Sequence, residues 1–196
     1  MPFDGSLIEA IVQESRSHSV ELPWIEFKSN FQDPQSIGEY VSALSNTAAL
    51  FNQAHGFLIW GINDSTHDID GTTFDPQKTK QGNQGLDLWI ATQLEPQIQF
   101  YFHKVEIEGK NVVLLEVGAA YSTPVKFRGI DYIRIDSHKK KLNDFPDTER
   151  ELWAALSKKP FETLMAEENL SEDFVLRLLD YSAYFDMLSM ELPTNK

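Results

Sequence analysis

Apolar side chains repeat every three or four residues in residues 6–17, 34–51 and 86–96. This spacing predicts three amphipathic helices. The start of the second is marked, because Asp33 can cap it and Pro34 fits the first helical position. The third should end before Pro96. The apolar stripe of the second helix, which we expect to face the core, is Ile37, Val41, Leu44, Ala48 and Phe51.

Other segments have the pattern of β-strands. In residues 22–28 the side chains alternate, so Trp24, Glu26 and Lys28 share one face. Residues 57–62 are almost wholly apolar, as expected of a buried strand. Glycines indicate two hairpins, one turning at residues 109–111 and one at Gly129. The predicted strands are residues 22–28, 57–62, 68–71, 98–108, 111–118, 124–128 and 130–137.

This order of elements predicts an α+β (mixed α/β) domain in which helices flank a central mixed sheet. Only helices are predicted after residue 145: residues 147–156, 160–167 and 171–179. We therefore assign residues 1–157 to the mixed domain and residues 158–196 to a C-terminal helical tail. Because the tail ends soon after an apolar stripe, we interpret it as the start of a region that is truncated in this chain.

Composition narrows the class of protein. Of the residues, 41% are hydrophobic and 12% aromatic, enough for a folded core. The absence of cysteine excludes disulfides, thiolate metal sites and cysteine nucleophiles. The sequence has neither a signal-peptide pattern nor an apolar run of membrane-spanning length. We expect a soluble cytoplasmic protein with no membrane partner.

The net charge of −13 weighs against a nucleic-acid-binding protein, but the cations are unevenly distributed. Residues 126–141 carry six Lys or Arg and two Asp. Tyr132 and Arg134 alternate with isoleucines, which places an aromatic ring and a cation on one face. The candidate nucleic-acid-binding residues are Lys126, Arg128, Tyr132, Arg134, Lys139, Lys140 and Lys141. The alternative is a solvated edge strand on which lysines prevent aggregation.

Acids flank the two strands at residues 22–28 and 57–62. If these strands are neighbours, Glu21, Glu26 and Asp64 meet at one end of a sheet, where carboxylates could hold Mg²⁺ or Mn²⁺. Glu21 and Glu26 would face opposite ways on a regular strand, but Pro23 predicts that the strand starts late or bulges. The alternatives are a solvated Glu26–Lys28 ion pair and an ordinary turn acid at Asp64.

Two further polar positions have open interpretations. Asn46 and Thr47 are either a helix C-terminal cap or a lining of the site. Three histidines, His55, His67 and His103, lack the spacing of metal ligands. There is no G-x-x-x-x-G-K-[ST] motif, so nothing supports ATP as a cofactor.

Four segments resemble the Schlafen/AlbA-like nucleic-acid-binding domain, which includes bacterial AlbA_2-type "divergent AAA" proteins. They lie in order within residues 20–157. Two departures stand out: where the family has a Gly-Gly pair after Asn-Thr, this chain inserts ALFNQAH before a single Gly56, and Asp136 stands where the family commonly has glycine. The four segments are EFK at residues 26–28 preceded by Glu21, ALSNTAA at 43–49, GFLIWGINDSTHDIDG at 56–71 and DYIRIDS at 131–137.

The resemblance implies a role for each acid. In the Schlafen branch, ribonuclease activity is attributed to two glutamates and an aspartate that fall here on Glu21, Glu26 and Asp64. They would hold Mg²⁺ or Mn²⁺ for an attacking water while Lys28 steadies the charge. We expect a nucleic-acid-binding domain for DNA or RNA, with metal-dependent cleavage as its catalytic form. The alternative is a non-catalytic ligand- or partner-sensing module of a larger transcriptional regulator, with homodimerisation as a further option.

Overall fold

The computed structural model describes residues 5–18 and 21–157. Contacts within the chain divide it into a unit spanning Pro2–Lys159 and a second comprising Met1 with Pro160–Lys196. All described residues belong to the first unit. The predictions made for residues 158–196 lie outside them, and the domain boundary stays a prediction.

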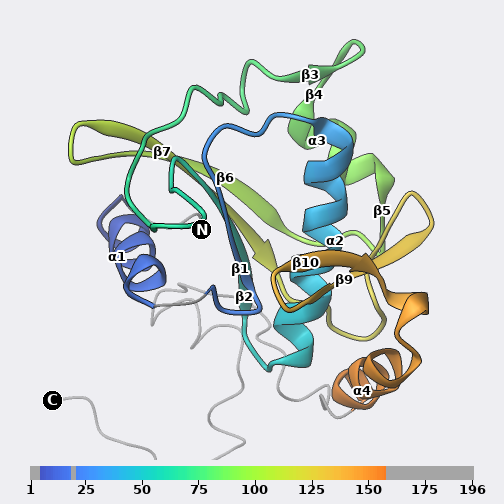
Figure 1. Cartoon of the computed structure of the whole chain (residues 1–196). Coiled ribbons are helices and arrows are strands. Elements are labelled where there is room, and N and C mark those ends of the chain that lie inside the picture. The colour runs from blue at the N-terminus through green and yellow to red at the C-terminus, as the bar shows by residue number, and fades with distance from the viewer. Residues whose placement is uncertain (1–4, 19–20, 158–196) are drawn as a thin grey trace, which may run out of the picture. The chain divides into compact units, whose positions relative to one another are not determined.

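The predicted α+β fold with a mixed sheet flanked by helices is confirmed, and a second four-stranded sheet and a two-stranded sheet of β3 and β4 accompany the mixed sheet (Figure 1). In the mixed (first) sheet, β1 pairs in parallel with β2, β2 pairs antiparallel with β7, and β7 pairs antiparallel with β6. The second has the order β10-β9-β8-β5 and is antiparallel throughout. The strands are β1 Ile25–Lys28, β2 His55–Trp60, β3 Lys80–Gln81, β4 Gln84–Gly85, β5 Leu94–Glu95, β6 Phe100–Ile107, β7 Lys110–Gly118, β8 Lys126–Phe127, β9 Ile130–Ile135 and β10 His138–Lys141.

Helix α2 is the element that both sheets share. It contacts β2 and β7 of the first sheet and β8, β9 and β10 of the second. Figure 1 shows α2 on one side of the first sheet and α1 on the other. Accordingly, one apolar cluster surrounds α2 and a second lies between the first sheet and α1. The helices are α1 Gly5–Ser17, α2 Pro34–Leu50, α3 Leu86–Gln93, the short 3₁₀ helix η1 Leu142–Asp144 and α4 Pro146–Ser157.

Glycine at position 38 lets the second sheet approach α2 closely. A Cβ atom there would lie 2.1 Å from the ring of Phe127 in β8. No side chain larger than hydrogen fits at this distance, so the packing of β8 on α2 requires Gly38.

Buried polar side chains of α2 hold β9 and the segment before β8 through main-chain hydrogen bonds. Asn46 Nδ2 donates to the carbonyl oxygens of Val125 and Tyr132, and Asn46 Oδ1 accepts from Val125 N. Thr47 Oγ1 accepts a hydrogen bond from Arg134 N. Asn46 and Thr47 therefore neither cap α2, which ends at Leu50, nor line the candidate cavity described below. They fix the strand that carries Arg134.

Most predicted elements are present with shifted ends. Asp33 caps α2 by accepting a hydrogen bond from Ser36 N, as predicted. Phe51 lies beyond the helix and is exposed, contrary to the predicted stripe. The predicted helix at 86–96 ends at Gln93, because its last residues enter β5. The predicted strand at 68–71 is reduced to one bridge, between Ile62 and Ile69.

The two hairpins are present as well. Glu108 and Gly109 form the first turn, both with positive φ, one residue before the predicted centre. The second turn is at Arg128 and Gly129 as predicted. Strand β10 was not predicted, because three consecutive lysines lack the alternation that marks a strand. None of the described helices is both long enough and apolar enough to cross a membrane.

Candidate functional site

A turn at Pro23 brings Glu21 alongside Glu26. Strand β1 begins only at Ile25, and Ile25 N donates to Leu22 O across the turn. Glu21 consequently folds back along the outer edge of β1, where its Oε1 accepts a hydrogen bond from Phe27 N at 3.1 Å. The late strand start predicted from Pro23 is confirmed. It removes the difficulty that the two glutamates would face opposite ways.

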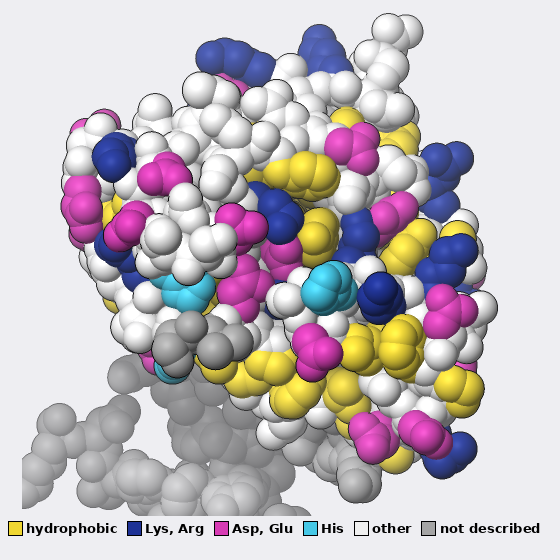
Figure 2. All heavy atoms as spheres, viewed as in Figure 1, with side chains coloured by type: hydrophobic (Ala, Val, Ile, Leu, Met, Phe, Trp, Pro, Cys, Tyr) yellow, Lys and Arg dark blue, Asp and Glu magenta, His cyan; other side chains and the backbone are white. Residues whose placement is uncertain are grey.

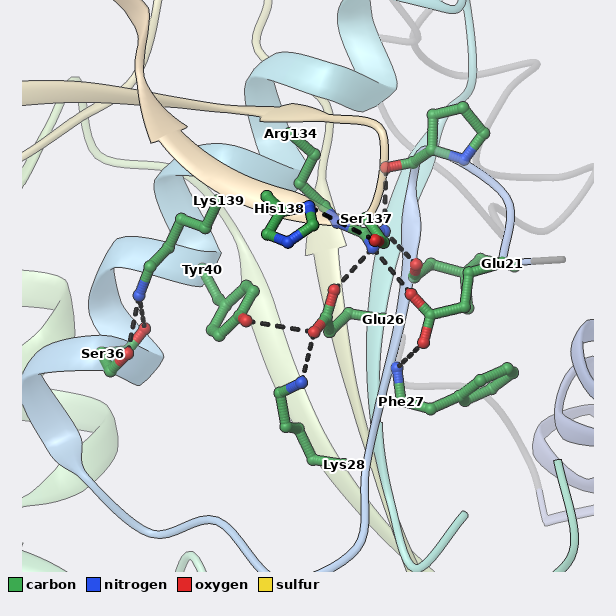
Figure 3. Close-up of polar contacts among 12 residues, drawn as sticks. Glu21, Glu26, Phe27, Lys28, Ser36, Tyr40, Arg134, Ser137, His138 and Lys139 are labelled. Carbon is green, nitrogen blue, oxygen red and sulfur yellow. Dashed lines mark hydrogen bonds and ion pairs between the residues drawn. The ribbon is translucent and has the colours of Figure 1, made fainter. Parts of the chain in front are cut away.

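Arg134 of β9 lies between the two glutamates (Figure 3). Its Nη2 is 2.8 Å from Glu21 Oε2 and 2.5 Å from Glu26 Oε2. Its Nη1 donates to the main-chain oxygens of Leu22, Pro23 and Ile25. The side chain of Arg134 has no exposed surface and that of Glu26 is 3% exposed. The guanidinium therefore joins both carboxylates to the turn that positions Glu21.

The other oxygen of Glu26 has its own donors. Tyr40 Oη, from α2, donates to Glu26 Oε1 at 3.0 Å, and Lys28 Nζ lies 2.5 Å from the same oxygen. Glu26 Oε2 accepts no hydrogen bond among the described residues, so its ion pair with Arg134 balances its charge. Each of the four carboxylate oxygens of Glu21 and Glu26 thus faces a donor or cation of the chain itself.

An open cavity of about 670 Å³ lies over this ion cluster. Asp64, on the turn after β2, lines the same cavity, so all three predicted acids and Lys28 share it. Figure 2 shows Lys, Arg, Asp, Glu and His side chains side by side across the middle of this face. The lining residues are Glu21, Glu26, Lys28, Ser36, Tyr40, Asp64, Ser65, His67, Ser137, His138 and Lys139.

The environment of the cavity shifts several pKa values. Burial and the neighbouring Glu26 charge raise the pKa of Glu21, although Arg134 opposes this. Burial and the Glu26 carboxylate also raise the pKa of Tyr40, so the phenol stays protonated and donates a hydrogen bond to Glu26. Burial lowers the pKa of Lys139 despite its hydrogen bond to Glu39.

The arrangement does not fit a preformed metal site. The glutamate oxygens already face Arg134, Tyr40, Lys28 and a main-chain N–H, and Asp64 is exposed. Among the described residues no three His, Cys, Asp or Glu side chains are grouped so as to hold an ion. Glu116 and its two histidine neighbours do not form such a group either, although Glu116 lies 3.2 Å from a ring nitrogen of His55 and 2.8 Å from one of His103.

The predicted basic edge divides into buried and exposed parts. Tyr132 and Arg134 do share a face, but it points into the protein, and they are 8% and 3% exposed. The expectation that Arg134 lies on an open phosphate-contacting edge is wrong, because it serves the two glutamates. Lys139 Nζ lies 2.7 Å from Glu39. Arg128, on the surface, donates to Gln35. The cations left open to solvent on this edge include Lys126, Lys140 and Lys141.

Sequence reasoning missed Tyr40 and His138, as well as the lining serines Ser36, Ser65 and Ser137. Tyr40 lies three residues after Ile37 on α2, where an aromatic residue is typical of a core helix. His138 follows directly after a segment that had been matched to the family. Only the positions of β1 and β10 beside α2 reveal that both side chains face the cavity.

Residues 21–143 match the Schlafen, AlbA_2 family. The chain belongs to this family. Membership of the Schlafen/AlbA_2 family implies a nucleic-acid-related domain. The match begins at Glu21 and ends just after β10, so it includes every residue of the cavity lining.

Two solved structures are similar to this Schlafen/AlbA_2 chain at low identity. One is the DIP2311 protein from Corynebacterium diphtheriae, with 18% identity, a TM-score of 0.40, and coverage of 69% of this chain and 26% of that chain. The other is the N-terminal domain of an ATP-dependent DNA helicase RecG-related protein from Nitrosomonas europaea, with 21% identity and a TM-score of 0.37. That match covers 57% of this chain and 72% of the other. Among curated proteins, none is similar enough to count as a match.

Proposed function

We propose that this domain binds nucleic acid, with backbone phosphates entering the cavity between β1, α2 and β10. The observation that carries the proposal is the combination of side chains around the opening: the cations Lys28 and Lys139 beside His138 and the hydroxyls of Ser36 and Ser137. Ammonium, imidazole and hydroxyl groups are the donors that phosphate oxygens accept.

The acidic residues of the cavity do not prevent the binding of a phosphate. Glu21 and Glu26 are balanced by Arg134 and by Lys28, so a phosphate would not meet two uncompensated carboxylates. Lys140 and Lys141 extend the cationic surface along β10. Because the rest of the chain is acidic, the affinity should be modest and should fall steeply with salt.

Fluorescence anisotropy at low salt tests the proposal, with labelled single-stranded and duplex RNA and DNA as probes. We expect Lys140→Ala/Lys141→Ala to weaken binding uniformly across sequences. Lys80→Ala, at an exposed lysine on β3, is the matched control and should bind as the wild type does. If none of the probes binds at low salt, or if the double variant binds like the control, the proposed interface is wrong.

A second candidate function is metal-dependent cleavage with Mg²⁺ or Mn²⁺ at Glu21, Glu26 and Asp64, which would require the ion to displace Arg134 from the two glutamates. The observation in its favour is that the three acids and Lys28 line one cavity. Asp64→Asn is the informative variant, because Asp64 is exposed and its change should not affect the fold. Mn²⁺-stimulated cleavage of structured RNA should be lost in Asp64→Asn and kept in Asp68→Asn, an exposed acid on the same turn. Equal activity in both variants would contradict the proposal.

The third option is a non-catalytic sensing module of a larger transcriptional regulator, in which a region beyond this chain binds DNA, alone or as a homodimer. It is favoured by the complete pairing of the Glu21 and Glu26 oxygens within the chain. Binding without cleavage at any Mn²⁺ concentration supports this option over the nuclease. The wild-type and Asp64→Asn chains would then behave alike.

A further inference from the structure

Arg134 is the one charged side chain of the described residues that contacts both glutamates, and it contacts the turn between them as well. A single nitrogen, Nη2, forms both ion pairs, while Nη1 donates to the Leu22, Pro23 and Ile25 carbonyls. A guanidinium remains protonated at all physiological pH values and offers a planar fork of donors. It can therefore bind two carboxylates and three carbonyls at once, which the single ammonium of a lysine could not do.

A divalent ion shared by Glu21 and Glu26 would have to contact oxygens from both. The inward oxygen of each, Oε2, is the one that faces Arg134 Nη2. The remaining oxygens face Phe27 N on one glutamate, and Tyr40 and Lys28 on the other. The position between the two carboxylates is thus occupied by a cation that belongs to the chain (Figure 3).

We propose that Arg134 is a resident counter-cation, which takes the place of a metal ion between Glu21 and Glu26 and keeps both carboxylates oriented when no metal is bound. Arg134 is in this sense a positioning residue. The proposal concerns the cation between the carboxylates, so it holds whether or not the cavity binds nucleic acid. It implies that Arg134 and a divalent ion compete for the same two carboxylates.

The competition predicts opposite responses of two chains to metal. In the wild type, Mn²⁺ gains no access to the inward oxygens, so millimolar Mn²⁺ should leave the melting temperature as it is in EDTA. In Arg134→Met the buried Glu26 and the partly buried Glu21 lose the cation that they share, and the melting temperature in EDTA should fall by roughly 10 °C. Mn²⁺ should then bind between the two carboxylates that have lost Arg134 and restore roughly 5 °C or more of the loss.

The matched control also removes the negative charges of Glu21 and Glu26, which Arg134 balances. Arg134→Met combined with Glu21→Gln and Glu26→Gln should melt above Arg134→Met in EDTA and should not respond to Mn²⁺. If Arg134→Met alone does not fold, this triple variant still decides, because the proposal requires that neutralising the glutamates restores folding. Arg134→Lys should lie between the wild type and Arg134→Met, since a lysine keeps the charge but not the fork of donors.

Two results would overturn the proposal. One is a wild-type melting temperature that rises with Mn²⁺ as much as that of Arg134→Met, which would mean that the guanidinium and the ion do not compete. The other is a triple variant that remains unfolded or as unstable as Arg134→Met, because the instability would then come from lost packing. Neither result depends on nucleic acid, so a failure of the binding experiment leaves this test unaffected.

Discussion

Strands β9 and β10 pair with each other, yet their cations have opposite environments. Arg134 on β9 lies directly across from Lys139 on β10. The Arg134 side chain is fully buried and the Lys139 side chain 13% exposed, while Lys140 and Lys141 face solvent. The first cation stabilises carboxylates inside the chain, and the last two remain free for a partner. A cluster of positive charge in a sequence can therefore contain structural and binding cations side by side.

The largest effect should come from the buried member of this comparison. Arg134→Ala leaves the buried Glu26 and the partly buried Glu21 without their shared partner, and we expect it to lower the free energy of unfolding by about 3–5 kcal/mol. Lys140→Ala, at an exposed position three residues after the hairpin turn at residues 136–137, should change it by less than about 0.5 kcal/mol. Urea unfolding of the two variants measures the difference. Equal stabilities would mean that the ion cluster contributes nothing.

A somewhat smaller loss of stability is expected at Asn46, through which α2 holds β9. Asn46→Ala removes three buried hydrogen bonds and leaves the Val125 and Tyr132 carbonyls without this donor. We expect a loss of about 2–3 kcal/mol in urea unfolding. Gln53→Ala, which removes an exposed side-chain hydrogen bond after the same helix, is the control and should lose far less. If Asn46 only filled space, Asn46→Leu would restore the stability that Asn46→Ala loses.

These residues also show how far the sequence could predict the molecule. Helix α2 was predictable from its cap and its apolar spacing, and the hairpins from their glycines, because these signals are local. The division into two sheets was not, since the hydrogen bonds of Asn46 to Val125, just before β8, and of Thr47 to Arg134 of β9 link positions about eighty or more apart. For Asn46 and Thr47 the sequence suggested a helix cap or a lining of the site, because their actual partners could not be read from the chain.

The candidate site was predictable in composition and not in arrangement. The acids Glu21, Glu26 and Asp64 and the cation Lys28 were selected through their charges and a family resemblance, and they do line one cavity. The role of Arg134 could not be foreseen, because alternation along β9 gives the face of a side chain but not what covers that face. Helix α2 and the Pro23 turn cover it, which converts an expected surface cation into a buried one.

The pH dependence of stability separates two carboxylates of this region. Burial and the nearby Glu26 raise the pKa of Glu21 above its ordinary 4.5. The contribution of Glu21 to stability is therefore complete below pH 4.5 and is lost as the pH rises above it. For Glu39, burial acts to raise the pKa, but hydrogen bonds from Lys139 and Gln35 outweigh it and lower the pKa. Its contribution is present above pH 4.5 and is lost as the pH falls below that value.

Glu21→Gln and Glu39→Gln should accordingly change the pH profile in opposite directions. Relative to the wild type, Glu21→Gln should gain stability as the pH rises through the region above 4.5, and Glu39→Gln should lose stability as the pH rises towards 4.5. Each change should be at most about 1 kcal/mol, and less for the solvent-screened Glu39. Urea unfolding at a series of pH values measures both. Parallel profiles would contradict the assigned environments.

The smallest effect on stability, and the one that bears on function, is expected at the exposed lysines of β10. Lys140→Ala/Lys141→Ala should leave urea unfolding within about 0.5 kcal/mol of the wild type, because neither side chain is buried. If each lysine contacts one phosphate, the dependence of log K on log salt should become shallower by about 1 for each lysine removed. A loss of affinity with an unchanged salt slope would mean that the lysines act through the fold. A shallower slope with unchanged stability would identify them as the cations that meet nucleic acid, while Arg134 serves the glutamates beneath them.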